Sequence, residues 1–195
     1  MATIVGVRCR DGVVLAGDRL RVRDGRVESR NRQHVFDFDL DGDAVGGAAV
    51  GPDVGRFADR LGSELRSYRL ERGPVPLAAV ERIGSDVASE TGSEAIVAAR
   101  DRDRDHDEDE DGDGNGNGRA ALRAVYPDGS TLSDSPAVFG SGASLALGQL
   151  EAADLDAMSV DDCESFLRET FGAVAERDPG TGEAVDVWTL ADETD

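Results

Sequence analysis

The sequence predicts an α+β fold, a four-layer αββα sandwich in which two antiparallel β-sheets are packed between pairs of helices. The order of the predicted elements supports this: strands come first, then two stretches of helical periodicity, then strands, two more helices and a last strand. The 195 residues contain no long apolar run. We therefore expect one soluble, cytoplasmic domain that spans residues 1–195.

The start of the chain predicts a β-hairpin. Residues 3–9 and 13–18 are rich in β-branched side chains, and Asp11-Gly12 lies between them. Asp-Gly favours tight hairpin turns because both residues tolerate a positive φ. A polar run at 19–32 follows, with a second turn signal at Asp24-Gly25.

The remaining elements follow in order. We expect strands at 35–39, 44–50, 94–100, 119–125 and 184–190. We expect helices from Asp53, from about Pro76, after Gly142 and from Ser159, where capping or turn residues precede apolar residues spaced by three and four. Small residues at 44–50 indicate the close approach of another element. Trp188 is expected to fill the core.

One segment, residues 101–118, is almost entirely Asp, Glu, Arg, Gly and Asn. Such charge cannot be buried, so we predict a disordered acidic loop inserted between two strands that could pair. A calcium loop is the alternative, because Asp107, Asp109 and Asp111 match the first half of an EF-hand pattern. Gly118 stands where the bidentate Glu is needed, so we expect no metal and no cofactor.

The charge is strongly acidic, with 41 Asp and Glu, 21 Arg, no Lys and a net charge of −20. Repulsion between like charges argues against nucleic acid and against an anionic membrane surface as partners. The composition resembles that of halophilic archaeal proteins, whose carboxylate surface stays hydrated in high salt. Cys9 and Cys163 lack the spacing of metal ligands and are predicted to be buried free thiols.

Several different short motifs follow one another along the chain, and their order resembles that of a known family. They are Thr3-Ile4-Val5-Gly6, Asp11-Gly12, Asp18-Arg19, Val35-Phe36, Gly47-Ala48-Ala49-Val50-Gly51, Gly140-Ser141-Gly142, Arg177-Asp178 and Thr181-Gly182. In this order and spacing they resemble the proteasome β subunits, which are N-terminal-nucleophile hydrolases. The resemblance implies the sandwich fold and assembly into rings. The extra N-terminal helix of the family's α subunits is not seen.

The resemblance also implies a catalytic mechanism, for which this chain has only some of the residues. In the family, an N-terminal Thr hydroxyl attacks, its own amine accepts the proton, and a Lys held by an Asp assists. The nucleophile position falls on Ala2, which has no hydroxyl. The Asp position is Asp18, and the Lys position is His34, which is largely neutral near pH 7.

The supporting positions of the family are mostly filled. The backbone amide that stabilises the oxyanion falls on Ala48, which keeps the amide but adds a methyl group. Ser141 and Asp178 match the supporting Ser and Asp, and Thr181 stands in place of a second Ser. For both His34 and Asp18 a purely structural role is the alternative. His34 would be hydrogen-bonded to Asp18 without a role in turnover, and Asp18 would bond the amides of a turn.

Three functions are therefore considered. The first is a non-catalytic proteasome β-like protein with a structural or regulatory role, assembled with proteasome-type subunits or with itself. The second is a threonine-type endopeptidase or amidase that uses Thr3 after Ala2 is removed. A shift of one residue in a strand turns the side chain to the opposite face, which argues against the use of Thr3 as nucleophile. The third is a monomeric binding protein on the same fold.

Overall fold

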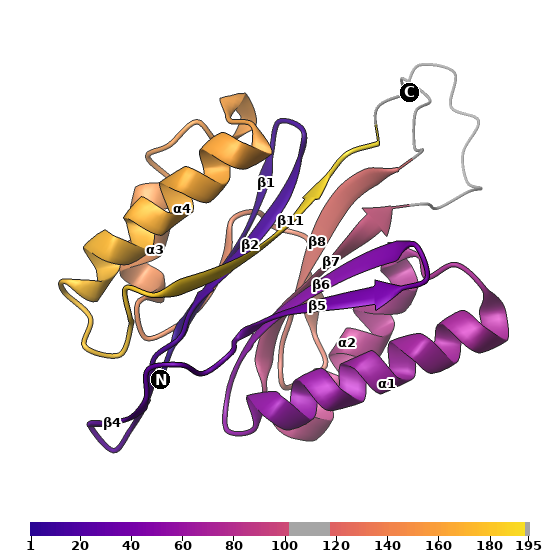
Figure 1. The fold of residues 1–195 in the computed structure, drawn as a ribbon, viewed down its shortest axis with the longest axis horizontal. Coiled ribbons are helices and arrows are strands. Elements are labelled where there is room, and N and C mark those ends of the chain that lie inside the picture. The colour runs from indigo at the N-terminus through magenta and orange to yellow at the C-terminus, as the bar shows by residue number, and fades with distance from the viewer. Residues whose placement is uncertain (102–117, 194–195) are drawn as a thin grey trace.

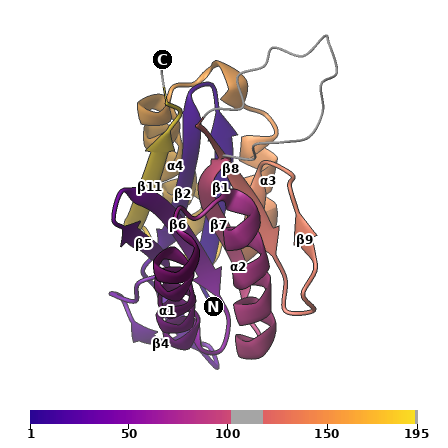
Figure 2. The same cartoon turned by 90° about the vertical axis from the view of Figure 1, so that its right-hand side faces the viewer.

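The computed structural model describes residues 1–101 and 118–193, which form two facing β-sheets between two helix layers (Figure 1). Figure 2 looks onto α1 and α2, behind which the strands of the two sheets lie. The predicted α+β sandwich is confirmed. None of the helices within the described residues has the length and apolar character that a membrane span requires.

Both sheets are antiparallel. The four-stranded sheet has the order β10-β1-β2-β11 and contains β1 (Thr3–Cys9), β2 (Gly12–Asp18), β10 (Ala137–Gly140) and β11 (Val185–Ala191). The five-stranded sheet has the order β5-β6-β7-β8-β9 and contains β5 (Val35–Leu40), β6 (Asp43–Val50), β7 (Glu94–Asp101), β8 (Arg119–Val125) and β9 (Thr131–Leu132). In β7 and β8, Asp101 lies opposite Arg119. The acidic segment predicted at 101–118, with its calcium-loop alternative, falls between these strands in the sequence. Its residues 102–117 lie outside the described residues.

The four α-helices of the described residues begin where capping residues were expected. They are α1 (Val54–Arg72), α2 (Leu77–Thr91), α3 (Ala143–Leu150) and α4 (Val160–Ala175). The Asp53 carboxylate accepts a hydrogen bond from the Arg56 amide at the start of α1. At the start of α4, Ser159 and Asp162 form a reciprocal capping box.

The core has three apolar layers. One lies between α1, α2 and the five-stranded sheet, one between the sheets, and one between the four-stranded sheet and α3, α4. Neighbouring residues of β1 enter different layers: Ile4 joins the layer between the sheets, and Val5 joins the layer beneath α3 and α4. Because both faces of β1 are covered, the strand is apolar except at Thr3 and Arg8.

A close approach between the sheets explains the small residues of β6. Trp188 on β11 is 9% exposed and its indole lies against Gly46, where a side chain would collide with the ring. The indole N–H donates to Asp37 at 3.0 Å. Trp188 therefore fills the core, as predicted, and requires a glycine opposite it.

Several elements differ from the sequence-based expectations, among them the short edge strands β9 and β10. The polar run at 19–32 contains a small hairpin, β3 (Arg21–Arg23) and β4 (Arg26–Ser29), rather than a turn alone. Asp24 and Gly25 have φ angles of 51° and 73°, both in the left-handed region that tight hairpin turns need. A short 3₁₀ helix, η1 (Leu155–Ala157), also precedes α4. Neither segment has the apolar periodicity by which the sequence reveals longer elements.

Candidate functional site

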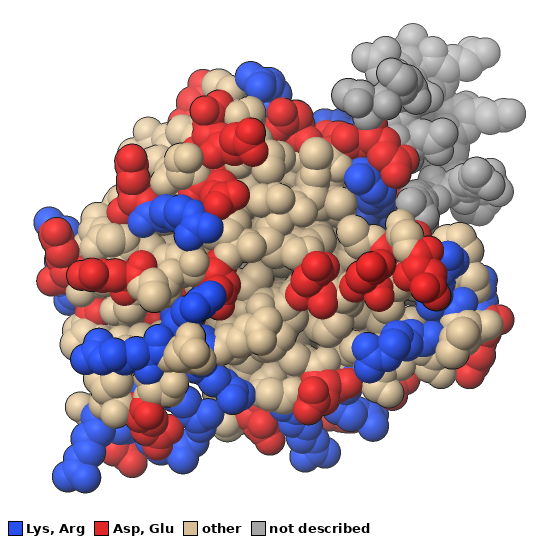
Figure 3. Space-filling view, viewed as in Figure 1, with Lys and Arg blue, Asp and Glu red and all other residues tan. Residues whose placement is uncertain are grey.

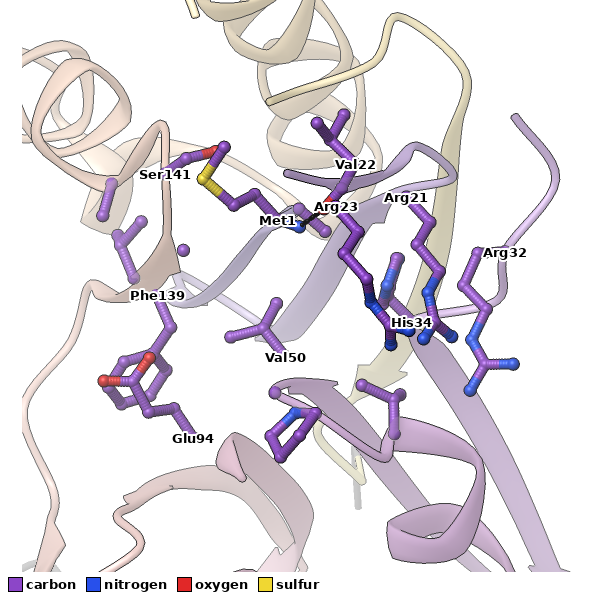
Figure 4. Close-up of a pocket in the computed structure, with 17 residues that line it drawn as sticks. Met1, Arg21, Val22, Arg23, Arg32, His34, Val50, Glu94, Phe139 and Ser141 are labelled. Atoms are coloured by element: carbon purple, nitrogen blue, oxygen red, sulfur yellow. Dashed lines mark hydrogen bonds between the residues drawn. The ribbon is translucent and has the colours of Figure 1, made fainter. Parts of the chain in front are cut away.

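A cavity of about 630 Å³ lies at the beginning of β1, where the N-terminus runs beside the β3–β4 hairpin (Figure 4). Its walls come from β3, the start of β5, the β6–α1 connection, and the junction of β10 with α3. The lining includes Met1, Ala2, Arg21, Val22, Arg23, Arg32, His34, Val50, Glu94, Phe139 and Ser141. The cavity thus brings together three of the predicted site positions, Ala2, His34 and Ser141.

Ala2 lies at the cavity and is held in place by its backbone. Its carbonyl accepts a hydrogen bond of 3.1 Å from the Ser141 amide, and its side chain is 3% exposed. Gly140 has a φ of 102°, and a side chain there would collide with the Ala2 carbonyl oxygen. The residue that faces the cavity from the start of β1 is therefore fixed, and its methyl group offers no nucleophile.

Thr3 points the other way. It follows the alternation of β1, so that Ala2 and Ile4 share the layer between the sheets while Thr3 lies on the side of Val5. Thr3 is fully buried, and its hydroxyl accepts a hydrogen bond of 2.9 Å from the Gly142 amide. Its side chain is absent from the cavity lining.

The Thr3 hydroxyl belongs to a polar chain that ends at a carboxylate. Thr181 donates to Asp178 at 2.6 Å, so the 2.7 Å contact between the hydroxyls of Thr3 and Thr181 has Thr3 as donor. Ser141 also donates to Asp178 at 2.6 Å. Burial raises the pKa of Asp178, but the bonds from Ser141, Thr181 and the Gly180 amide outweigh it and hold that pKa below its ordinary value. The three predicted positions Ser141, Asp178 and Thr181 therefore form one network.

The Asp18 carboxylate accepts hydrogen bonds from backbone amides. Its side chain is fully buried, and its two oxygens accept hydrogen bonds from the amides of Thr3, Leu20 and Gly182 at 2.6, 2.8 and 2.9 Å. Burial raises the pKa of Asp18 to about 6, against the opposing effect of these amides. The carboxylate ties the starts of β1 and β3 to the segment before β11.

His34 contacts the main chain of Asp18 rather than its carboxylate. Its Nδ1 lies 2.7 Å from the Asp18 carbonyl oxygen, which only accepts, so Nδ1 carries the proton. Burial lowers the pKa of His34, and the positive charges of Arg32, the N-terminus and Arg21 lower it further, although the bond to Asp18 opposes this. The imidazole is therefore neutral near pH 7 and places no cation beside Ala2.

Comparisons with known proteins identify the family. A model of the proteasome subunit family matches residues 1–98 and 113–190. The chain belongs to the proteasome subunit family. A proteasome subunit beta from Methanopyrus kandleri is 28% identical over 98% of this chain and 87% of the relative. Proteasome subunit beta 2 of Pyrobaculum neutrophilum is 30% identical over 95% and 87%, and a proteasome subunit beta of Natrialba magadii is 28% identical over 98% and 74%.

One expected site position of this proteasome-family chain lies away from the cavity. Ala48 on β6 is fully buried in the layer between the sheets, where it pairs with Val35 and Ile96. It is absent from the cavity lining, which β6 enters only at Val50. Ala48 nevertheless belongs to the same buried layer as Ala2, and the amide of the next residue, Ala49, donates to the His34 carbonyl at 2.9 Å.

Three arginines of this site were not expected from the sequence. Arg21, Arg23 and Arg32 line the cavity, although the run at 19–32 was interpreted only as polar. A signal for them exists: residues 19–32 contain arginines at positions 19, 21, 23, 26, 30 and 32 but acidic residues only at 24 and 28. In a chain with a net charge of −20, a short run of positive charge indicates a local function.

Proposed function

We propose that this chain is a non-catalytic proteasome β-type subunit with a structural or regulatory role. The observation that carries the proposal is the pair of positions at the start of β1. Ala2 faces the cavity without a hydroxyl, and the hydroxyl of Thr3 is buried on the opposite side of the strand, bonded to Gly142 and Thr181. A side chain that could attack a peptide carbonyl is missing where the family's mechanism needs one.

The neutral state of His34 supports the same proposal. Its position corresponds to the lysine whose charge assists the nucleophile in the family, and the lowered pKa of His34 removes that charge. The bond from Nδ1 to the Asp18 carbonyl gives His34 a structural role at the start of β5. Ala2 and His34 thus both lack a group that the family's mechanism needs, the hydroxyl in one case and the positive charge in the other.

Use of Thr3 after removal of Ala2 is less favoured by this geometry. Its amide donates to Asp18 at 2.6 Å, and its hydroxyl accepts from Gly142 and donates to Thr181. The chain would need to turn about the strand axis to bring Thr3 into the cavity, which would break these bonds. Intact mass, read to single-residue accuracy on protein from its native host, identifies the first residue. A start at Thr3 together with peptide hydrolysis would overturn the proposal.

A gain-of-function variant tests the chemistry directly. We expect no hydrolysis of fluorogenic peptides by the unmodified protein, in low or in high salt. The double variant Ala2→Thr and His34→Lys, prepared with a leader that is cleaved directly before residue 2, restores the nucleophile, its free amine and the cation. Turnover by this variant alone would show that only the chemistry is lost. Turnover by the unmodified protein would contradict the non-catalytic role.

Assembly with other subunits is the second part of the proposal. The relatives carry the name proteasome subunit beta. We expect this chain to join such subunits, or copies of itself, through the two helix layers that form its outer faces. Native mass spectrometry of protein purified from its host should show a complex far above the chain mass of 20.5 kDa. A monomer alone would favour the third function, a binding protein.

A further inference from the structure

The two cysteines of the chain lie in the same apolar layer. Cys9 is the last residue of β1, and Cys163 lies in the first turn of α4. Both are free thiols and both are buried, as predicted, with 1% and 0% of their surface exposed. They belong to the layer between the four-stranded sheet and the helices α3 and α4. The chemistry considered above uses neither of them, and only the fold brings these distant positions together.

Hydrogen bonds hold the end of β1 against the start of α4. The Arg10 amide donates to the Met158 carbonyl at 3.0 Å, and the Val160 amide donates to the Asp11 carboxylate at 2.8 Å. The turn between β1 and β2 is therefore tied to the residues at the start of α4. Because this turn directly follows Cys9, the same bonds place the Cys9 thiol against the inner face of the helix.

The two thiols are hydrogen-bonded to each other. The Cys9 thiol donates to the Gly12 carbonyl at 3.1 Å, and its sulfur accepts from Cys163. The bond from Cys163 lowers the pKa of Cys9, and the Asp11 backbone lowers it too, although burial opposes them. The same contact and burial raise the pKa of Cys163. Since the thiolate is the reactive form of cysteine, Cys9 is the attacking sulfur of the pair.

The surface above α4 restricts which oxidants can approach the pair. In the space-filling view, charged side chains are spread over the region where Figure 1 places α4 (Figure 3). Asp161 and Asp162 are exposed at the start of the helix, in a chain with a net charge of −20. This charge repels anionic reagents, and the burial of both thiols disfavours bulky ones. A small, uncharged oxidant such as hydrogen peroxide fits these limits.

We propose that hydrogen peroxide converts Cys9 and Cys163 into a disulfide bond that links the end of β1 to α4. The Cys9 thiolate attacks one peroxide oxygen, the O–O bond breaks, and hydroxide leaves and takes up the thiol proton. The Cys163 sulfur then attacks the sulfenic acid at Cys9, the S–S bond forms, and the hydroxyl leaves as water with the Cys163 proton. Two thiols thus lose two electrons and two protons, and one peroxide becomes two waters. The bond does not depend on the role proposed above.

The disulfide gives the helix layer a reversible covalent attachment. It closes a loop of the chain from residue 9 to residue 163 and so restricts the unfolded state far more than the folded one. Thiol reductants open the bond again. Oxidation therefore stabilises the contact between the β1–β2 hairpin and α4, and reduction weakens it.

Intact mass of the full chain tests the bond. Reduced protein is treated with hydrogen peroxide, and the remaining thiols are then blocked with a maleimide in denaturant. The reduced chain should carry two maleimides, whereas the oxidised chain should carry none and lose two hydrogens. Peptide mapping should find Cys9 joined to Cys163, and dithiothreitol should separate them. Unreacted thiols, a bond between two copies, or sulfinic acid without a bridge would overturn the proposal.

Two matched variants separate the roles of the sulfurs. In Cys163→Ala the sulfenic acid at Cys9 has no partner, so it should persist and be trapped by dimedone. In Cys9→Ala the remaining thiol, with its raised pKa, should react with peroxide about tenfold more slowly than Cys9 does in the first variant. Equal rates would contradict the assignment of Cys9 as the attacking sulfur. Circular dichroism checks that both variants fold, and the mass measurement on the unmodified chain stands without them.

Urea unfolding measures the effect on stability. The oxidised chain should unfold at a higher urea concentration than the reduced chain, and Cys163→Ala treated with the same peroxide should show no such rise. An equal or lower midpoint for the oxidised chain would contradict a stabilising bond. Native mass spectrometry of both redox forms reports assembly separately, so a failure of the proposed ring role and a failure of the disulfide are told apart.

Discussion

The backbone amide of Thr3 donates to the Asp18 carboxylate at 2.6 Å, and the second oxygen of that carboxylate accepts from Leu20 and Gly182. Asp18 thereby joins β1, the start of β3 and the segment before β11, which are distant in sequence. In this chain Asp18 is a structural anchor beside the cavity at the start of β1.

The first prediction concerns this anchor. Asp18→Asn replaces one accepting oxygen with an NH₂ group, which must then face at least one backbone N–H that it cannot bond. We expect the free energy of unfolding to fall by about 1–3 kcal/mol, the usual cost of an unsatisfied buried group. Denaturant unfolding followed by circular dichroism measures it. Asp39→Asn on the exposed side of β5 is the control and should change stability by less than about 0.5 kcal/mol.

The second prediction is a pH dependence. Burial raises the pKa of Asp18 from 3.8 to about 6, so the folded protein holds this proton more tightly than the unfolded chain. Between pH 3.8 and about 6, folding therefore takes up a proton. The stability that protonated Asp18 contributes is present at low pH and is lost as the pH rises through about 6. Its slope is at most about 1.4 kcal/mol per pH unit. Because other carboxylates titrate nearby, the measurement is the difference in slope between the unmodified protein and Asp18→Asn. Identical slopes would refute the raised pKa.

The third prediction concerns the buried hydroxyl of Thr3. Thr3→Val keeps the shape of the side chain but leaves the Gly142 amide without an acceptor, so we expect a loss of about 1–3 kcal/mol in unfolding free energy. Thr3→Ser keeps the hydroxyl and should lose less. Thr189→Val, at an exposed position of β11, is the matched control and should be nearly neutral. A neutral Thr3→Val would mean that the hydroxyl is not held as described.

The fourth prediction concerns the contact between the sheets. Gly46→Ala places a methyl group against the Trp188 indole, and the overpacked core should lose about 1–3 kcal/mol of stability. Gly148→Ala makes the same change within α3, where no atom lies within 4 Å of the added methyl. There alanine favours the helix by about 0.5–1 kcal/mol. Thermal unfolding of the two variants should therefore shift in opposite directions, and shifts of the same sign would contradict the packing.

Most of the helices and strands, and their order, follow from local signals in the sequence. Hairpin turns, capping residues such as Asp53 and Ser159, and apolar spacing are local signals, and the elements that they indicate begin within about two residues of the expected positions. The short elements β3, β4, β9, β10 and η1 were not expected from such signals. The alternation of a strand also places Ala2 and Thr3 on opposite faces before any contact is known. The absence of a hydroxyl at position 2 is likewise plain from the sequence.

The environment that distant residues share depends instead on the packing of the folded chain. That His34 bonds the main chain of Asp18, that Ala48 lies outside the cavity, and that Thr3 reaches Thr181 all depend on how the two sheets face each other. The arginines at 21, 23 and 32 were visible as charge, but only the placement of the β3–β4 hairpin beside the cavity brings them to one side of it. Local sequence sets backbone preference over a few residues, whereas burial, pKa and hydrogen-bond partners are set by neighbours that folding brings from elsewhere in the chain.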